Sequence, residues 1–212
     1  MQPRMRIYLA VVAVLLTALG VYHLCGRGGG SESLTGDPEK IVAEIDAICR
    51  RGDRADAARL VPLTSHADQQ VARAAMDALA VLDADAARQT LGGLLRDEKD
   101  PQKRAAAAEA YGHTPSSDPQ VLAAVLTQDE APEVRAGAAR GLARLSSPQR
   151  PEGLPAFVAA LRDEDPKVRA WAVRGIERVS GKRFPYDPAR SPESQTEQIR
   201  GIKDQLRAMG WL

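Results

Sequence analysis

Apolar and polar positions recur with the period of an α-helix along most of this chain. The clearest stretch follows Asp163, where apolar residues spaced at i, i+4, i+8 and i+11 fall on one helical face. These positions are Val168, Ala172, Ile176 and Val179. Acidic residues and Pro166 precede them, and both suit the first turn of a helix. The pattern therefore predicts an amphipathic helix that starts near Pro166.

The same unit returns along the chain. Copies lie at residues 70–79, 100–111, 129–142 and 163–176, the first of them degraded. The equivalent positions are Val71, Lys103, Val134 and Val168, which are 32, 31 and 34 residues apart. A nearly fixed period in this range is typical of a helical solenoid, in which stacked units bury a continuous core.

Each unit contains a second amphipathic segment ahead of its turn. The three clear examples are residues 86–95, 121–126 and 154–161. A helix, a turn and a helix at this length predict paired antiparallel helices. Small residues such as Ala74, Ala106 and Gly137 occupy the middle of the units, so neighbouring helices can approach closely.

The pattern acid-Pro-x-Val-Arg-x-x-Ala-Ala resembles HEAT repeats, and among them the short variety of the phycobilisome-lyase-like group. The resemblance covers roughly residues 54–180. It implies an all-α fold: a right-handed α-solenoid of about four short helix pairs, with N- and C-terminal capping helices. The resulting domain prediction places the repeats at residues 37–180 and the C-terminal cap at 181–212.

The resemblance also implies a structural ladder. In HEAT proteins an Asp of the turn and an Arg after the valine link adjacent repeats. The matching residues are Asp129 with Arg135 and Asp163 with Arg169, while Arg104 aligns with Glu98 or Asp97. Ala72 interrupts the ladder in the first unit.

A separate segment precedes the repeats. Residues 7–26 carry no charged side chain over 20 positions, close to the ~20 residues that cross a bilayer as a helix. Arg4 and Arg6 precede this segment and Arg27 follows it. The positive-inside bias predicts a single-pass anchor with residues 1–6 in the cytoplasm and the repeats outside it. Residues 27–36 have the composition of a flexible linker.

Two other interpretations of the leader remain open. A signal peptide could be cleaved at Ala18-Leu19-Gly20, which would leave the repeats periplasmic or secreted. A lipoprotein could be modified on Cys25, although Leu24 stands where a small residue is preferred. All three interpretations place the repeats beyond the membrane.

Helices are also predicted at both ends of the repeats. Asp37-Pro38 begins an N-terminal cap, and Ser191-Pro192 begins a final helix. A Gly-Lys-x-Phe-x-Tyr-Asp-Pro segment precedes that last helix, as in the tails of exported bacterial HEAT proteins. Four aromatic residues are expected to seal the C-terminal end, with a partner-binding patch as the alternative: Trp171, Phe184, Tyr186 and Trp211.

Charge and chemistry narrow the function. The net charge is +1, and residues 31–212 carry 26 basic and 28 acidic groups. The chain therefore has no overall positive electrostatic potential that would favour binding of nucleic acid. None of the three histidines has metal-binding spacing, and no nucleophile or phosphate-loop motif is present. These observations predict no cofactor, no metal site and no catalytic residues.

We therefore expect a non-enzymatic scaffold that binds an unidentified protein partner through the solenoid surface. The candidate contact residues line the exposed sides of the second helices: Arg73, Asp77, Glu109, Arg140, Arg174 and Arg178. One alternative is a structural spacer or subunit of an envelope complex, docked by its ends. The resemblance to bilin lyases adds a third, an enzyme acting on a tetrapyrrole-bearing protein, but the turns supply no acid–base pocket.

Overall fold

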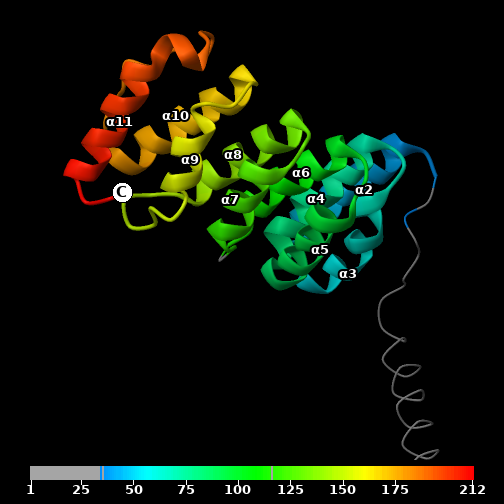
Figure 1. Cartoon of the computed structure of the whole chain (residues 1–212). Helices are drawn as coiled ribbons and strands as arrows, with labels where there is room; N and C mark the ends of the chain where they lie inside the picture. Colours follow the sequence, from blue (N-terminus) through cyan, green and yellow to red (C-terminus); the bar gives the residue numbers. More distant parts are fainter. Residues whose placement is uncertain (1–33, 35, 116) are drawn as a thin grey trace, which may run out of the picture. The chain divides into compact units, whose positions relative to one another are not determined.

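A computed structural model describes residues 34, 36–115 and 117–212, and this part of the chain is built from helices joined by short turns (Figure 1). Within it the only β-type pairing is an isolated bridge between Ser147 and Arg150. The α-helices are α2 (Pro38–Arg51), α3 (Ala57–Leu60), α4 (Gln69–Leu82), α5 (Ala84–Asp97), α6 (Pro101–His113), α7 (Pro119–Gln128), α8 (Pro132–Leu145), α9 (Leu154–Ala160), α10 (Pro166–Ser180) and α11 (Thr196–Ala208). Three 3-10 turns accompany them: η1 (Arg54–Asp56), η2 (Val61–Ser65) and η3 (Pro192–Gln195).

The predicted membrane segment, residues 7–26, lies outside the described residues, as do residues 1–6 and most of the 27–36 linker. Among the helices that are described, none combines the length and the apolar character needed to span a bilayer.

Four helices begin where an aspartate precedes a proline. Asp37, Asp100, Asp118 and Asp165 each cap a helix by accepting a hydrogen bond from a backbone N–H of its first turn. Each is followed by proline, which has no N–H to leave unpaired and whose fixed φ suits a first helical position. The expected helix starts at Pro38 and Pro166 are confirmed.

The helices form two rows. In one, the even row, α2 packs on α4, and α4, α6, α8 and α10 each pack on the next (Figure 1). The odd row consists of α3, α5, α7 and α9, and α5, α7 and α9 each pack on the even helix that follows in the chain. This arrangement is the stack of helix pairs that the repeat predicted.

The apolar face predicted for the last unit is buried between the rows. Val168, Ala172, Ile176 and Val179 are all fully inaccessible to solvent. Equivalent large side chains from the other helices are buried with them, among them Leu79, Leu91, Leu122, Leu142, Phe157 and Leu161. Because each helix buries one stripe against its neighbours, the core is continuous along residues 34–212, which form one compact unit.

The first pair departs from the others because its first member is broken. α3 ends at Leu60 and the chain continues as the 3-10 turn η2, which contains Pro62. Proline cannot donate the backbone hydrogen bond that would continue the α-helix, so a regular helix is not maintained here. The longest repeat spacing also has a local cause, because a long connection, residues 146–153, separates α8 from α9.

Small residues bring α6 and α8 into backbone contact. A Cβ placed on Gly141 would lie 2.5 Å from the carbonyl oxygen of Ala108, and one on Gly137 would lie 2.6 Å from that of Ala105. A Cβ on Gly112 would lie 2.2 Å from the Cα of Gly141. No side chain fits between these helices, so glycine is required for their separation.

The C-terminal segment covers the end of the stack. Phe184 and Tyr186 are buried in the core, and the Tyr186 hydroxyl donates a hydrogen bond of 2.5 Å to the carbonyl oxygen of Leu161. Helix α11 buries Ile199, Ile202 and Leu206. Trp171 does not join Phe184 and Tyr186 in this cap, because it lies on α10 beside arginines of the even row. The expected four-residue aromatic seal therefore needs correction at Trp171.

Candidate functional site

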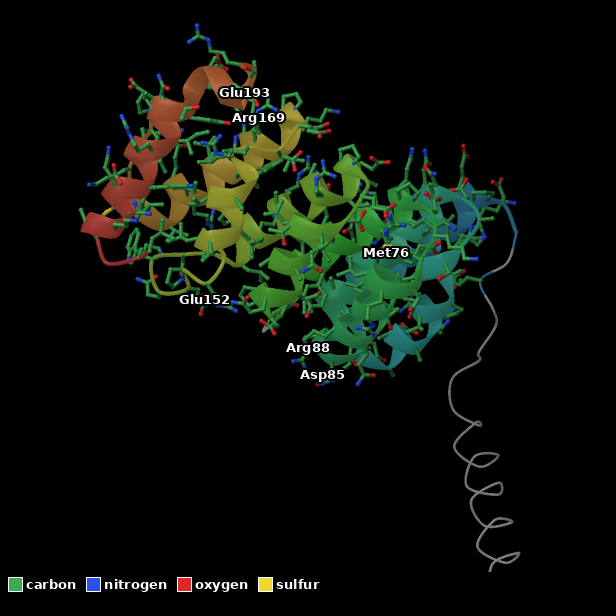
Figure 2. The ribbon with its side chains drawn as sticks, in the orientation of Figure 1. Met76, Asp85, Arg88, Glu152, Arg169 and Glu193 are labelled. Carbon is green, nitrogen blue, oxygen red and sulfur yellow. The ribbon has the colours of Figure 1, made fainter. Side chains whose placement is uncertain are left out.

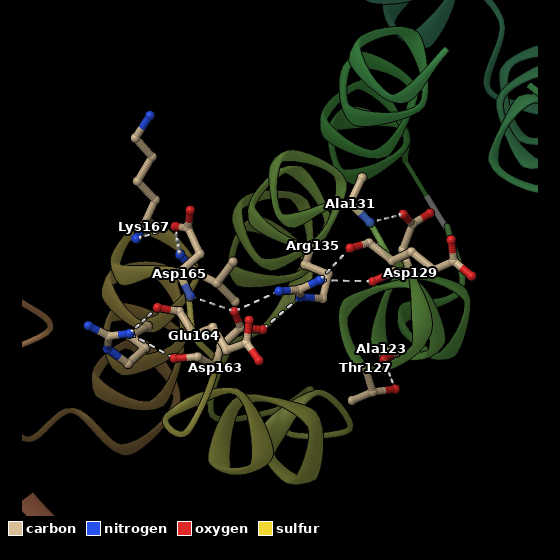
Figure 3. Close-up of polar contacts among 12 residues, drawn as sticks. Ala123, Thr127, Asp129, Ala131, Arg135, Asp163, Glu164, Asp165 and Lys167 are labelled. Carbon is tan, nitrogen blue, oxygen red and sulfur yellow. Dashed lines mark hydrogen bonds and ion pairs between the residues drawn. The ribbon is translucent and has the colours of Figure 1, made fainter. Parts of the chain in front are cut away.

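The ladder residues link successive units through paired hydrogen bonds (Figure 3). Nε and Nη2 of Arg135 donate to the two carboxylate oxygens of Asp163 at 2.7 and 2.9 Å. Nε and Nη2 of Arg104 bind Asp129 in the same way, at 3.1 Å each. The hydrogen bonds from the Asp163 carboxylate raise the pKa of Arg135 above its ordinary value. Each pair therefore joins the turn of one unit to the helix of the unit before it.

Within its own unit, each arginine binds the turn instead of the aspartate carboxylate. Nη1 of Arg135 donates to the carbonyl oxygens of Asp129 and Glu130, both at 3.0 Å. The Asp129 carboxylate in turn accepts the backbone N–H of Ala131 at 2.9 Å. One guanidinium group thus stabilises its own turn and holds the next unit in register.

The earlier units show how the motif aligns. The Glu98 carboxylate accepts a hydrogen bond from the N–H of Asp100 at 3.0 Å. The Asp129 carboxylate accepts the equivalent hydrogen bond, from the N–H of Ala131, in the next turn. Glu98, and not Asp97, is therefore the structural equivalent. Ala72 has no side chain that could reach Glu98. The first two units are joined instead by Arg54, whose Nε and Nη2 donate to Asp83 at 2.8 and 2.9 Å.

The last rung is closed by the backbone. Arg169 is almost fully buried, and its Nε and Nη2 donate to the carbonyl oxygen of Pro188 at 3.0 and 2.7 Å. Nη2 also reaches the carbonyl oxygen of Arg190 at 3.2 Å. The C-terminal segment thus occupies the place that the next unit's aspartate would take. Figure 2 shows Arg169 on the α10 side of the molecule.

The surface candidates come together on the exposed side of α4, α6, α8 and α10, which we call the even face. Nη1 of Arg140 lies 2.7 Å from Oε1 of Glu109, and Nη2 of Arg73 binds the other oxygen of the same carboxylate. Glu109 is only 14% exposed, and two arginines from neighbouring helices neutralise it. A chain of contacts thus runs from α4 through α6 to α8.

An aromatic ring extends this chain to α10. The guanidinium carbons of Arg140 and Arg174 each lie 4.9 Å from the centroid of the half-buried Trp171 ring. Both distances are within the range of cation–π attraction. Four of the six candidates, Arg73, Glu109, Arg140 and Arg174, are therefore brought together around one connected cluster.

The other two candidates lie at its margins. Arg178 donates from Nε to the carbonyl oxygen of Ser146 at 3.1 Å, which ties α10 to the end of α8. Asp77 lies 3.9 Å from Nε of Arg73. Burial raises the pKa of the Asp77 carboxyl, although the charge of Arg73 opposes this rise. Burial also lowers the pKa of His113, and Arg144 acts in the same direction.

Two further cations of the even face were not predicted. Lys167 and Arg144 are exposed, and in residues 34, 36–115 and 117–212 neither side chain is within ion-pair distance of a carboxylate. Both could have been found from the period, because they occupy the positions of Glu133 and Arg178 in neighbouring units. Trp171 could have been assigned to this face from its spacing of three residues before Arg174, which is one helical turn.

A shallow hollow of about 510 Å³ lies in the middle of the even face. Its lining includes charged side chains, small residues such as Gly137, and the Trp171 ring. The charged side chains are Arg73, Glu109, Glu133, Arg140 and Lys167. No group of three or more His, Cys, Asp or Glu side chains in the described part of the chain is arranged to hold a metal ion. The chemistry that this arrangement supports is the binding of anionic and apolar groups at an open surface.

Comparison with known proteins supports the repeat assignment. Residues 119–188 match the model of a family described as HEAT repeats, a range that begins at α7 and ends in the segment after α10. This match and the all-helical fold together support a HEAT-repeat protein. No curated protein matches the chain.

Proposed function

We propose that this chain is a non-enzymatic scaffold that binds a protein partner through the even face. HEAT repeats suggest a protein-interaction scaffold in general. The observation that carries the proposal is the cluster around Trp171, where a large aromatic side chain is left half-buried between arginines of two helices. Tryptophan and arginine are the residue types most enriched where binding energy concentrates at protein interfaces.

The proposal also includes the location of the scaffold. Residues 7–26 anchor it in a membrane, with the N-terminus cytoplasmic and the repeats on the other side. The 20 uncharged positions and the arginines before them support this topology. The repeat spacing of 31 to 34 residues supports the short variety of HEAT unit.

An alternative function is a spacer that docks by its ends. The C-terminal end offers a specific observation in its favour, because Leu212 is exposed and Trp211 is only half-buried beside it. In that case the even face would be an ordinary solvated surface.

Site-specific photo-crosslinking in cells that express the full-length chain distinguishes the two functions. A photoreactive amino acid is placed singly at Lys167 and Arg144 on the even face, at Arg88 on α5, and at Arg207 on α11. All four side chains are exposed, and Figure 2 shows Arg88 beside Asp85, away from the even row. We expect one protein to be crosslinked from Lys167 and Arg144 and not from the other two positions.

The opposite results are equally informative. Crosslinks from Arg207 alone would favour docking by the C-terminal end. Crosslinks from Arg88 alone would move the interface to the odd row. The absence of protein adducts at all four positions would contradict the scaffold function itself.

A further inference from the structure

The sign of the charge changes along the even face. The residue six positions after each repeat valine or its equivalent is Asp77 in α4, Glu109 in α6, Arg140 in α8 and Arg174 in α10. At this repeated position the charge is therefore negative in α4 and α6 and positive in α8 and α10. A binding surface with such a gradient favours one charge type, and one orientation, in whatever lies across it.

Ion pairs within the even face leave several of its basic side chains without a carboxylate partner. Glu109 is shared by Arg73 and Arg140, so its carboxylate is already paired, while the exposed carboxylate of Glu133 on α8 lines the same hollow. Among the described residues, the charged groups of Lys167, Arg144 and Arg174 have no ion-pair partner. Three exposed cations thus remain on two adjacent helices.

Trp171 lies next to two arginines of this basic end, on α8 and α10. A guanidinium that lies over an aromatic ring uses its flat face and leaves its in-plane N–H donors available. The guanidinium carbon of Arg174 lies over the Trp171 ring, 4.9 Å from its centroid. Since the ring limits its rotation, Arg174 loses less side-chain freedom when it binds a carboxylate. The Nε of Arg140 is buried and has no hydrogen-bond partner in the described part of the chain.

We infer that the basic end of the even face, formed by Arg140, Arg144, Lys167, Trp171 and Arg174, binds a short acidic segment of the partner protein. Carboxylates of the segment pair with Arg174 and Lys167, and an apolar side chain between them contacts the Trp171 ring. The hollow of about 510 Å³ that Trp171 and Gly137 help to line leaves room for the backbone of the segment. This inference rests on the proposed function, because it names the chemistry of the partner at the same face.

A nucleic acid fits this surface less well than an acidic peptide. A phosphate backbone requires basic side chains along an extended stripe. Here Lys167, Arg144 and Arg174 lie on α8 and α10, whereas the next helices present Asp77 and Glu109 together with their partner Arg73. The half-buried Trp171 also offers apolar surface, which suits a segment in which acidic and apolar residues are mixed.

The test is a binding titration with synthetic peptides and the full-length protein in detergent. The first peptide alternates Glu with Leu and carries a fluorophore, and the second replaces every Glu by Gln. We expect the Glu peptide to bind and the Gln peptide to bind roughly tenfold more weakly. The affinity for the Glu peptide should fall as the salt concentration rises. A Trp211→Phe background leaves Trp171 as the only tryptophan, so its fluorescence should change on binding.

Variants locate the contact. Arg174→Gln should weaken binding of the Glu peptide roughly tenfold, and Arg174→Lys should weaken it less, because the charge is kept while the planar fork is lost. Arg88→Gln, an exposed arginine on α5, is the matched control and should have no effect.

Three results would overturn the inference: equal binding of the two peptides, equal loss in Arg88→Gln and Arg174→Gln, or no binding of the Glu peptide at about 1 mM. These failures are distinguishable from failure of the proposed function. A partner that is still crosslinked from Lys167 and Arg144, but does not compete with the Glu peptide, would keep the even face as the interface and reject its acidic specificity.

Discussion

At the scale of single residues, the ladder pairs are the contacts whose loss should be measurable. The side chains of Arg135 and Asp163 are only 16% and 10% exposed, so removing one partner leaves the other poorly solvated. We expect Arg135→Gln to lower the free energy of unfolding by about 1–3 kcal/mol. Chemical denaturation monitored by circular dichroism measures this change.

An exposed ion pair provides the control for that experiment. Arg207 and Asp204 also pair at 3.1 Å, but their side chains are 62% and 59% exposed. Arg207→Gln should change stability by less than about 0.5 kcal/mol. Equal effects of Arg135→Gln and Arg207→Gln would show that the ladder adds nothing beyond a surface ion pair.

Asp83 provides a second residue-scale prediction, through pH. Hydrogen bonds from Arg54, together with the backbone N–H groups of Ala86 and Asp85, lower the pKa of Asp83 to about 2. The pKa of an unperturbed aspartate is about 3.9, so this carboxylate stabilises the fold above about pH 4. That contribution is lost as the pH falls from about 4 to about 2.

The pKa of Asp83 can be followed directly by NMR titration of its carboxyl carbon. In Arg54→Gln it should return toward the ordinary value, because the largest cause of the shift has been removed. Arg88→Gln removes a partner of the neighbouring Asp85 and should leave the pKa of Asp83 unchanged. An unchanged pKa in Arg54→Gln would contradict the assigned cause.

The ladder also shows how far sequence reasoning reaches at this scale. Its residues could be named, because an acidic turn followed by Val-Arg recurs at a nearly fixed period. The partner of each arginine could not be read with the same certainty, since it depends on the offset between stacked helices. Arg169 shows the limit most clearly, because its partners are carbonyl groups of Pro188 and Arg190 that no residue pattern marks.

At the scale of helices, close packing between α6 and α8 makes the strongest demand on residue size. A methyl group on Gly141 would lie 2.5 Å from the carbonyl oxygen of Ala108, a backbone atom that cannot move without its helix. Gly141→Ala should therefore lower the free energy of unfolding by about 1–3 kcal/mol. Urea denaturation measures this loss.

Gly93 in α5 is the matched control, since a Cβ there would meet nothing within 4 Å. Gly93→Ala should stabilise the protein by about 0.5–1 kcal/mol, because alanine is the better helix former. If both alanine variants stabilise the protein, the helices are not in the contact described for α6 and α8.

Helix boundaries followed from the sequence wherever Asp-Pro supplied both the cap and the first helical residue. Sequence reasoning was weaker where a single residue altered the geometry. Pro62 breaks the first member of the first pair, and the 146–153 connection lengthens the third unit before α9 begins. Both features are local interruptions of the repeat, which periodicity alone does not describe.

At the scale of the whole molecule, stacking turns a repeated position into a surface. Asp77, Glu109, Arg140 and Arg174 are far apart in sequence, but they occupy one position of successive units. Sequence reasoning could therefore propose these residues as a set, whereas the contacts of Arg140 with Glu109 and Trp171 required the distances between helices. Trp171 was expected in the C-terminal cap because large aromatic residues mostly bury area, and its place beside Arg140 instead makes it part of the even face.

The most direct test of the central claim is the dissociation constant of the full-length protein with the partner crosslinked from Lys167. It is measured for the wild type, for Trp171→Ala/Arg174→Ala on the even face, and for Arg88→Ala/Arg207→Ala as the control, after circular dichroism shows that both variants are folded. We predict that the even-face variant weakens binding roughly a hundredfold and that the control leaves it unchanged. An unchanged dissociation constant in the even-face variant would contradict the assignment of this face as the binding surface.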